Sequence, residues 1–175
     1  MGTESAEVTL RVGLGRDVHR LAEGGDLILG GVSVAAGIHC VAHSDGDCLL
    51  HALADALLGA ASLPNVGVLF PNDLEENRGR NSLEMLAGVV DLLGKKNLEA
   101  VNVDAVIQLE RPKISGFFTA MKDCVAKVLG LSAADVSIKA TTAEGLGPIG
   151  EGRAVEVFCI CLLRKRRRIC PSHEQ

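Results

Sequence analysis

The segment from Ala154 to Leu163 constrains the fold more than any other part of this chain. Its residues alternate with the two-residue period of a β-strand, and Phe158 and Ile160 on one face are as apolar as Val157 and Cys159 on the other. A strand that is apolar on both faces is covered on both sides. We therefore expect something beyond the chain's own helices, such as another subunit, to cover one face of the sheet.

Strands and helices alternate in places along the rest of the chain, which predicts an α+β (α/β) fold. The apolar spacing predicts helices over residues 47–61, 81–93 and 115–129 and strands over residues 8–13, 100–109 and 135–140. Aromatic residues are limited to four Phe, so the core has to be built from Leu, Val, Ile and Ala. Residues 64–80 form a long polar segment, and loops of that length are usually functional.

Charge and composition exclude several classes of function. Residues 1–163 carry 13 basic and 21 acidic side chains, and few aromatic rings are present to stack on bases, so we expect no nucleic-acid partner. We expect residues 1–163 to form a single domain. Residues 164–175 begin with a run of basic residues at 164–168, and we expect this C-terminal tail to be disordered. No apolar run reaches the roughly 18 residues of a membrane span. The six Cys form no C-x-x-C pair, which favours the cytoplasm, or an organelle if a presequence was removed.

Asp17 and His19 form the first chemical motif. They follow the predicted strand of residues 8–13, where polar side chains occupy the exposed end of a strand. Being two apart, they point to the same side of an extended backbone, and a carboxylate with an imidazole suits Zn²⁺. A surface pair without a metal explains this motif equally well.

The second motif is His43-Ser44-Asp45-Gly46-Asp47, followed by His51 on the predicted helix. Asp47 and His51 are four apart and are predicted to share a helix face. A core histidine bonded to a carbonyl is the usual explanation for such a residue, but the neighbouring His and carboxylates favour a ligand. Asp17, His19 and His51 together make three ligands and leave a fourth position open, as in catalytic zinc sites.

The third motif runs from Lys139 to Gly147, where a predicted strand enters a Gly-rich turn. Its Thr hydroxyls and loop amides can hold phosphate oxygens, and Glu144 is an oxygen ligand suited to Mg²⁺. Alone, the motif is better explained as an ordinary turn at a strand end.

Taken together, Asp-Val-His, His-Ser-Asp-Gly-Asp with the helical His51, Phe70-Pro71, Arg111-Pro112-Lys113 and Lys139-Ala-Thr-Thr-Ala-Glu resemble the 2-C-methyl-D-erythritol 2,4-cyclodiphosphate synthase family. The resemblance extends from Arg11 to Leu163. It implies a phosphorus–oxygen lyase of the non-mevalonate isoprenoid pathway. Such an enzyme converts 4-diphosphocytidyl-2-C-methyl-D-erythritol 2-phosphate to the 2,4-cyclodiphosphate and CMP.

The resemblance also assigns roles. Asp17, His19 and His51 would hold Zn²⁺, and Glu144 would hold Mg²⁺ or Mn²⁺ on the diphosphate. His43 and Thr142 would be the catalytic residues. The substrate-binding residues would be Asp17, His19, His43, Ser44, Asn65, Val66, Gly67, Phe70, Pro71, Asn72, Leu109, Pro112, Lys113, Ile114, Ser115, Ala140, Thr141, Thr142, Pro148 and Glu151. Among them, the segment from Leu109 to Ser115 with Ala140 and Thr141 would form the cytidine pocket. The fold would be a small, mainly four-stranded mixed sheet with helices on one face. Three such sheets would pack around the axis of a homotrimer with sites between subunits.

This chain departs from the family pattern at several positions. Asn65 and Asn72 stand where Asp is usual, and Gly-Glu-Gly-Arg at residues 150–153 replaces Gly-Arg-Gly-Glu. These changes bear on recognition of the methylerythritol unit and leave the metal ligands intact. Two other functions use the same features: a zinc-dependent phosphoester hydrolase, and a non-catalytic trimeric binding module.

Overall fold

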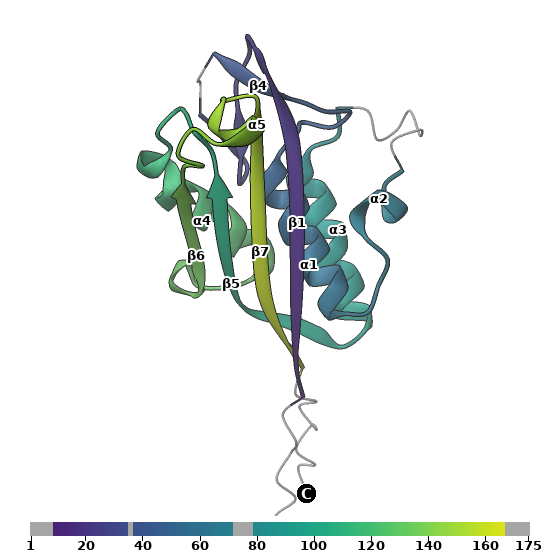
Figure 1. The fold of residues 1–175 in the computed structure, drawn as a ribbon. Coiled ribbons are helices and arrows are strands. Elements are labelled where there is room, and N and C mark those ends of the chain that lie inside the picture. The colour runs from purple at the N-terminus through teal and green to yellow at the C-terminus, as the bar shows by residue number, and fades with distance from the viewer. Residues whose placement is uncertain (1–8, 35–36, 72–78, 167–175) are drawn as a thin grey trace, which may run out of the picture.

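A computed structural model of the chain describes residues 9–34, 37–71 and 79–166 (Figure 1). In chain order its elements are β1 (Leu10–Glu23), β2 (Ile28–Leu29), β3 (Val32–Ser33), β4 (Ile38–Val41), α1 (Cys48–Ala60), α2 (Val66–Leu69), α3 (Ser82–Lys95), β5 (Leu98–Gln108), the 3₁₀ turn η2 (Ser115–Phe117), α4 (Phe118–Leu129), the 3₁₀ turn η3 (Ala133–Asp135), β6 (Val136–Thr141), α5 (Gly147–Gly150) and β7 (Ala154–Lys165).

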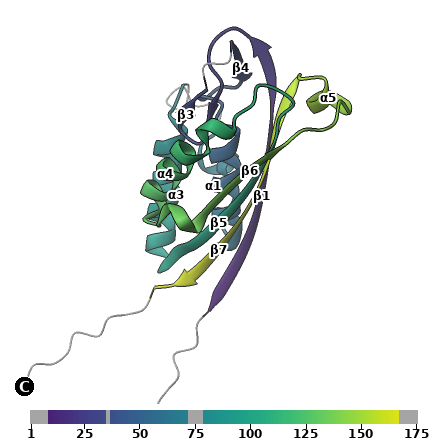
Figure 2. The ribbon, with the colours of Figure 1, turned by 90° about the vertical axis from the view of Figure 1, so that its left-hand side faces the viewer.

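The main sheet has the strand order β4-β1-β7-β5-β6. β7 runs antiparallel to both β1 and β5, whereas β5 and β6 are parallel and are joined through α4, so the sheet is mixed as predicted. The sheet has five strands rather than the predicted mainly four, because the short β4 pairs with the C-terminal end of β1, from Arg20 to Glu23. Figure 2 shows α1, α3 and α4 together on one side of this sheet, which confirms the predicted layering.

Helix α1 packs on the sheet with almost no space between the two backbones. A Cβ atom added at Gly13 would lie 1.9 Å from the carbonyl oxygen of Ala56, and one at Gly15 would lie 1.9 Å from that of Ala52. Both Ala are fully buried, as are Leu, Val, Ile and Cys side chains around them. The core is therefore aliphatic, as the composition predicted, and glycine is required where helix and strand meet.

The opposite face of the sheet is apolar and exposed. On β1, Val12 and Leu14 are 69% and 65% exposed, and on β7, Phe158 and Ile160 are 37% and 50% exposed. The other side of β7 is buried against the helices, including Val157. The two apolar faces predicted for this strand are thus present, and its own helices cover one of them.

Two predicted strand ends were wrong. The strand predicted over residues 8–13 continues to Glu23, because Gly13 and Gly15, which resemble turn residues in the sequence, serve instead as contact points for α1. The last strand continues two residues past Leu163, pairing Arg164 with Leu10 and Lys165 with Leu98. Residues 167–175 of the expected tail lie outside the described residues, so their disorder stays a prediction. Within the described ranges, no helix combines the length and apolar character needed to cross a membrane.

We expect Gly13→Ala to destabilise the fold by about 1–3 kcal/mol, because the new methyl group would force α1 away from β1. Urea unfolding followed by circular dichroism measures the change. Gly116→Ala is the control, since an added Cβ there meets no atom within 4 Å. Equal unfolding midpoints for the two variants would contradict the account of this contact.

Candidate functional site

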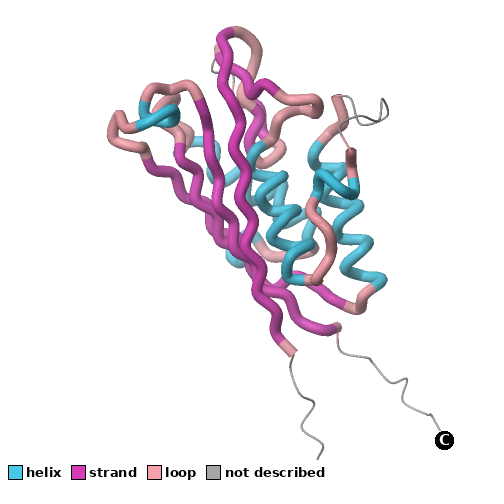
Figure 3. The backbone as a smooth tube through the Cα atoms, turned by 45° about the vertical axis from the view of Figure 1, so that its right-hand side comes forward, coloured by secondary structure: helices cyan, strands magenta, loops and turns pink. Residues whose placement is uncertain are grey.

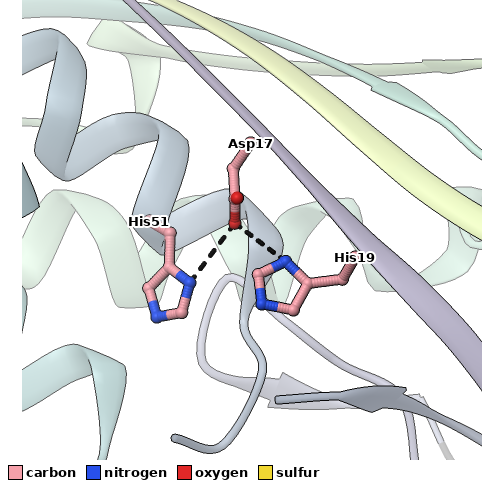
Figure 4. Close-up of side chains that lie close together, drawn as sticks. All are labelled: Asp17, His19 and His51. Atoms are coloured by element: carbon pink, nitrogen blue, oxygen red, sulfur yellow. Dashed lines mark ion pairs between the residues drawn. The ribbon is translucent and has the colours of Figure 1, made fainter. Parts of the chain in front are cut away.

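Three predicted metal ligands converge where β1 meets α1 (Figure 4). Asp17 and His19 lie two residues apart on the side of β1 that faces the helices, and His51 lies one turn into α1. Asp17 Oδ2 is 2.9 Å from His19 Nδ1 and 3.3 Å from His51 Nδ1. One ligand atom from each residue lies within 4.8 Å of the others, so a single cation can reach all three. Asp17 and His19 lie in the interior of β1, whereas the sequence predicted that they follow a strand.

The chemistry of these atoms fits a divalent cation. Asp17 Oδ2 and His19 Nδ1 are buried and have no aligned hydrogen-bond partner, an arrangement that is costly unless something else satisfies them. Carboxylate oxygen and imidazole nitrogen are ligands that Zn²⁺ accepts, and three protein ligands leave one position for a substrate oxygen. The residues present therefore fit the metal that the sequence predicted.

The charges of the cluster point the same way. Burial by itself raises the pKa of Asp17, but the close contacts with the rings of His19 and His51 outweigh burial and hold this pKa well below its usual range. Burial lowers the pKa of His51, but Asp17, with smaller effects from Asp47 and Asp45, raises it overall. The carboxylate is thus ionised and favours a positive charge at the centre of the cluster.

The cluster opens into a pocket of about 330 Å³. The pocket is lined by Asp17, Val18, His19, Arg20, Val41, Ala42, His43, Ser44, His51, Asp55, Val66, Gly67, Phe70 and Met85. Eight of these residues were predicted as site residues from the sequence. The structure therefore brings the first two chemical motifs and part of the polar segment 64–80 into one cavity.

Asp55 lines this pocket but was not predicted. It lies one helical turn after His51, and its Oδ1 accepts a hydrogen bond of 2.6 Å from Val66 N. Burial raises its pKa above the ordinary value. The four-residue spacing from His51 was the signal that could have found it.

Asp47, which was predicted to share a helix face with His51, does not line the pocket. It is the N-cap of α1 and is fully buried, and its carboxylate accepts hydrogen bonds from Leu50 N (3.0 Å), Gly30 N (2.9 Å) and Gly31 N (2.6 Å). Burial raises its pKa to about 6 against the effect of these donors. Asp47 thus ties the start of α1 to the β2–β3 turn.

Asn65 also has a structural contact. As the N-cap of α2 it accepts a hydrogen bond of 3.1 Å from Val68 N, and it does not line the pocket, whereas Val66 and Gly67 do. Pro71 is half-buried beside Phe70. Asn72 lies outside the described residues.

The residues predicted to bind cytidine form a second pocket, of about 300 Å³, at the other side of the sheet. It is lined by Leu109, Glu110, Pro112, Lys113, Ile114, Ser115, Phe118, Ala140, Thr141 and Thr142. Thr142 Oγ1 donates a hydrogen bond of 2.5 Å to Glu144 Oε1 in the turn that follows β6. Pro148 lies in α5. Glu151 directly follows this helix, and its carboxylate accepts a hydrogen bond from Arg153.

The two pockets do not meet within one chain. The first lies against β1 and β4 and the second against β5 and β6. In the layer of strands, β7 lies between β1 and β5 (Figures 1 and 3). Thr142 and Glu144 are therefore separated from His51 by the width of the sheet.

The sequence model of the YgbB family matches residues 10–164, which is nearly all of the described structure. The chain belongs to the YgbB family. Among relatives of this family, a 2-C-methyl-D-erythritol 2,4-cyclodiphosphate synthase from Clostridium perfringens is 43% identical over 156 residues, covering 89% of this chain and 100% of the relative. One from Chlorobaculum tepidum is 44% identical over 154 residues, covering 88% and 98%.

Solved structures of proteins with similar sequences share the fold of this chain. A Plasmodium falciparum IspF in complex with CDP is 34% identical, with a TM-score of 0.80 over 90% of this chain and 97% of that one. The bifunctional IspDF from Campylobacter jejuni is 35% identical, with a TM-score of 0.88. The chain spans only 43% of that protein and 39% of a bifunctional IspD/IspF from Desulforudis audaxviator.

We expect His51→Ala and Asp17→Ala to lose bound zinc, because two ligands cannot replace the converging set of three. Zinc is measured by elemental analysis after dialysis, with circular dichroism to confirm folding. His39→Ala is the matched control, since His39 Nδ1 contacts Gly24 O at 2.8 Å, outside the cluster. A His51→Ala chain that keeps one zinc per chain would refute the assignment.

Proposed function

We propose that this chain converts 4-diphosphocytidyl-2-C-methyl-D-erythritol 2-phosphate into 2-C-methyl-D-erythritol 2,4-cyclodiphosphate and CMP, as a lyase of the non-mevalonate isoprenoid pathway. One observation carries the proposal. Curated synthases of this name align along their whole length with a chain that places Asp17, His19 and His51 around one point in a pocket. The metal-cluster geometry and the relatives support the same reaction.

The reaction needs no reactant other than the substrate, and its products are the cyclic diphosphate and CMP. An oxygen of the 2-phosphate forms a bond to the β-phosphorus, and the bond from that phosphorus to the bridging oxygen breaks. The electron pair leaves with CMP, so no water is consumed. Because nucleophile and electrophile belong to one molecule, orientation supplies much of the rate, and a phosphate nucleophile needs no general base.

Metals would supply the positive charge that this acidic chain lacks. Asp17, His19 and His51 would hold Zn²⁺, and Glu144 would hold Mg²⁺ or Mn²⁺; when bound, such ions polarise phosphoryl oxygens and neutralise charge that develops on them.

The remaining roles belong to side chains at the two pockets. His43 and Ser44 line the first pocket beside the metal cluster and would donate hydrogen bonds to phosphate oxygens. Thr142 would do so from the other side, and the pocket from Leu109 to Thr142 would hold the cytidine. Asp55 positions the backbone of Val66 at the pocket wall, which would shape the space for the methylerythritol unit.

A homotrimer would bring the two pockets together. Within one chain they lie on either side of β7, so a complete site requires a second copy that places its β5–β6 side beside the first copy's β1. The exposed apolar face of β1 and β7 offers the surface for that contact, since an area of this kind is unusual on a monomer.

We expect the purified chain with Zn²⁺ and Mg²⁺ to convert the cytidine diphosphate substrate to the cyclic diphosphate. Phosphorus NMR distinguishes the products. A linear phosphorylated product together with CMP would instead indicate a zinc-dependent phosphoester hydrolase. Binding without turnover, in a chain that retains no zinc, would indicate a binding module.

We expect the chain to sediment as a trimer, and Ile160→Asp to dissociate it, because the new charge would be buried on the apolar face. Sedimentation velocity measures both. Val68→Asp serves as the control, since Val68 is also an exposed apolar side chain but lies on α2, away from that face. An active monomer at assay concentration would contradict the shared site.

A further inference from the structure

His51 makes a second set of contacts on the side of its ring that faces away from Asp17. Its Nε2 lies 3.0 Å from Ser82 Oγ and 3.3 Å from Ser44 Oγ. Ser82 is only 1% exposed and is the first residue of α3. The Ser82 hydroxyl is buried and contacts a candidate metal ligand. Its hydrogen bonds therefore bear on the orientation of the His51 ring.

Ser82 is held in place by groups other than His51. Its backbone N–H donates to Asp45 Oδ2 at 2.8 Å, and its hydroxyl donates to Asp45 Oδ1. Nearby, Gly79 N donates to His43 O at 2.7 Å and Asp45 N to Arg80 O at 3.3 Å. The start of α3 is thus fastened to the loop before α1 independently of the histidine.

The Ser82 hydroxyl is also not needed to cap α3. Asn81 is the N-cap, and its side chain accepts a hydrogen bond of 2.8 Å from Leu83 N. The hydroxyl is therefore free to bridge Asp45 and His51.

The hydrogen bonds of Ser82 favour a proton on Nε2 of His51. A carboxylate only accepts, so the hydroxyl proton of Ser82 points to Asp45, and Ser82 Oγ can only accept from His51 Nε2–H. A neutral imidazole has one N–H, which leaves Nδ1 with a bare lone pair facing Asp17 and His19.

We infer that Asp45 and Ser82 form a positioning pair that holds His51 in the tautomer and ring orientation needed to bind a divalent cation through Nδ1. The inference rests on the proposed metal site. It adds two residues, neither of which lines the pocket, to the groups on which metal binding depends. Partners of metal-binding histidines commonly change metal affinity by 10–100-fold.

The test compares Ser82→Ala with Asn81→Ala. The first removes the bridge to His51, and the second removes the cap of the same helix without touching the histidine. We expect Ser82→Ala to weaken zinc binding about 10–100-fold in a chelator competition, with a shifted visible spectrum of the Co²⁺-substituted protein. Asn81→Ala should lower the melting temperature and leave zinc affinity unchanged.

Nitrogen NMR of the unaltered chain loaded with zinc gives a second readout that needs no variant. We expect the Nε2–H tautomer at His51. The Nδ1–H tautomer, or zinc binding by Ser82→Ala within two-fold of the unaltered chain, would overturn this inference alone. Failure of the unaltered chain to bind zinc would overturn both it and the proposed metal site.

Discussion

The close contact between α1 and β1 is the constraint on which the rest of the site depends. Glycine at positions 13 and 15 lets the backbone of α1 lie directly on the strand, and the fully buried Ala52 and Ala56 complete the contact from the helix. His51 directly precedes Ala52 in α1, and Asp17 lies two residues after Gly15 in β1. The close approach of helix and strand therefore places His51 beside Asp17. A bulkier residue in the contact would separate the ligands by the width of a side chain.

Residue spacing predicted the parts of the site that depend on local structure. Asp17 and His19 alternate correctly in a strand, and His51 interrupts an apolar helix, so these ligands could be identified before any contact was known. Family resemblance grouped Leu109 to Ser115 with Ala140 and Thr141, and the structure places them around one pocket.

Other features depend on tertiary contacts that no local pattern records. Gly13 and Gly15 look like a strand end until the backbone of α1 lies against them, which is why β1 was predicted too short. The role of Asp47 also depends on its position, because a residue at the N-cap turns its carboxylate back to the helix start. Ser82 carries no signal in the sequence, since its role arises from Asp45 and His51, 37 and 31 residues away.

The location of the three ligands on rigid elements has a thermodynamic consequence. All of them project from the packed contact of β1 with α1, so most of their rotamer freedom is lost when the chain folds rather than when an ion arrives. Small zinc domains differ, because their ligands become ordered only with the metal and the metal-free chain unfolds. Here an aliphatic core holds the ligands together by itself. At such a site, metal affinity would not be reduced by the entropy of ordering the ligands.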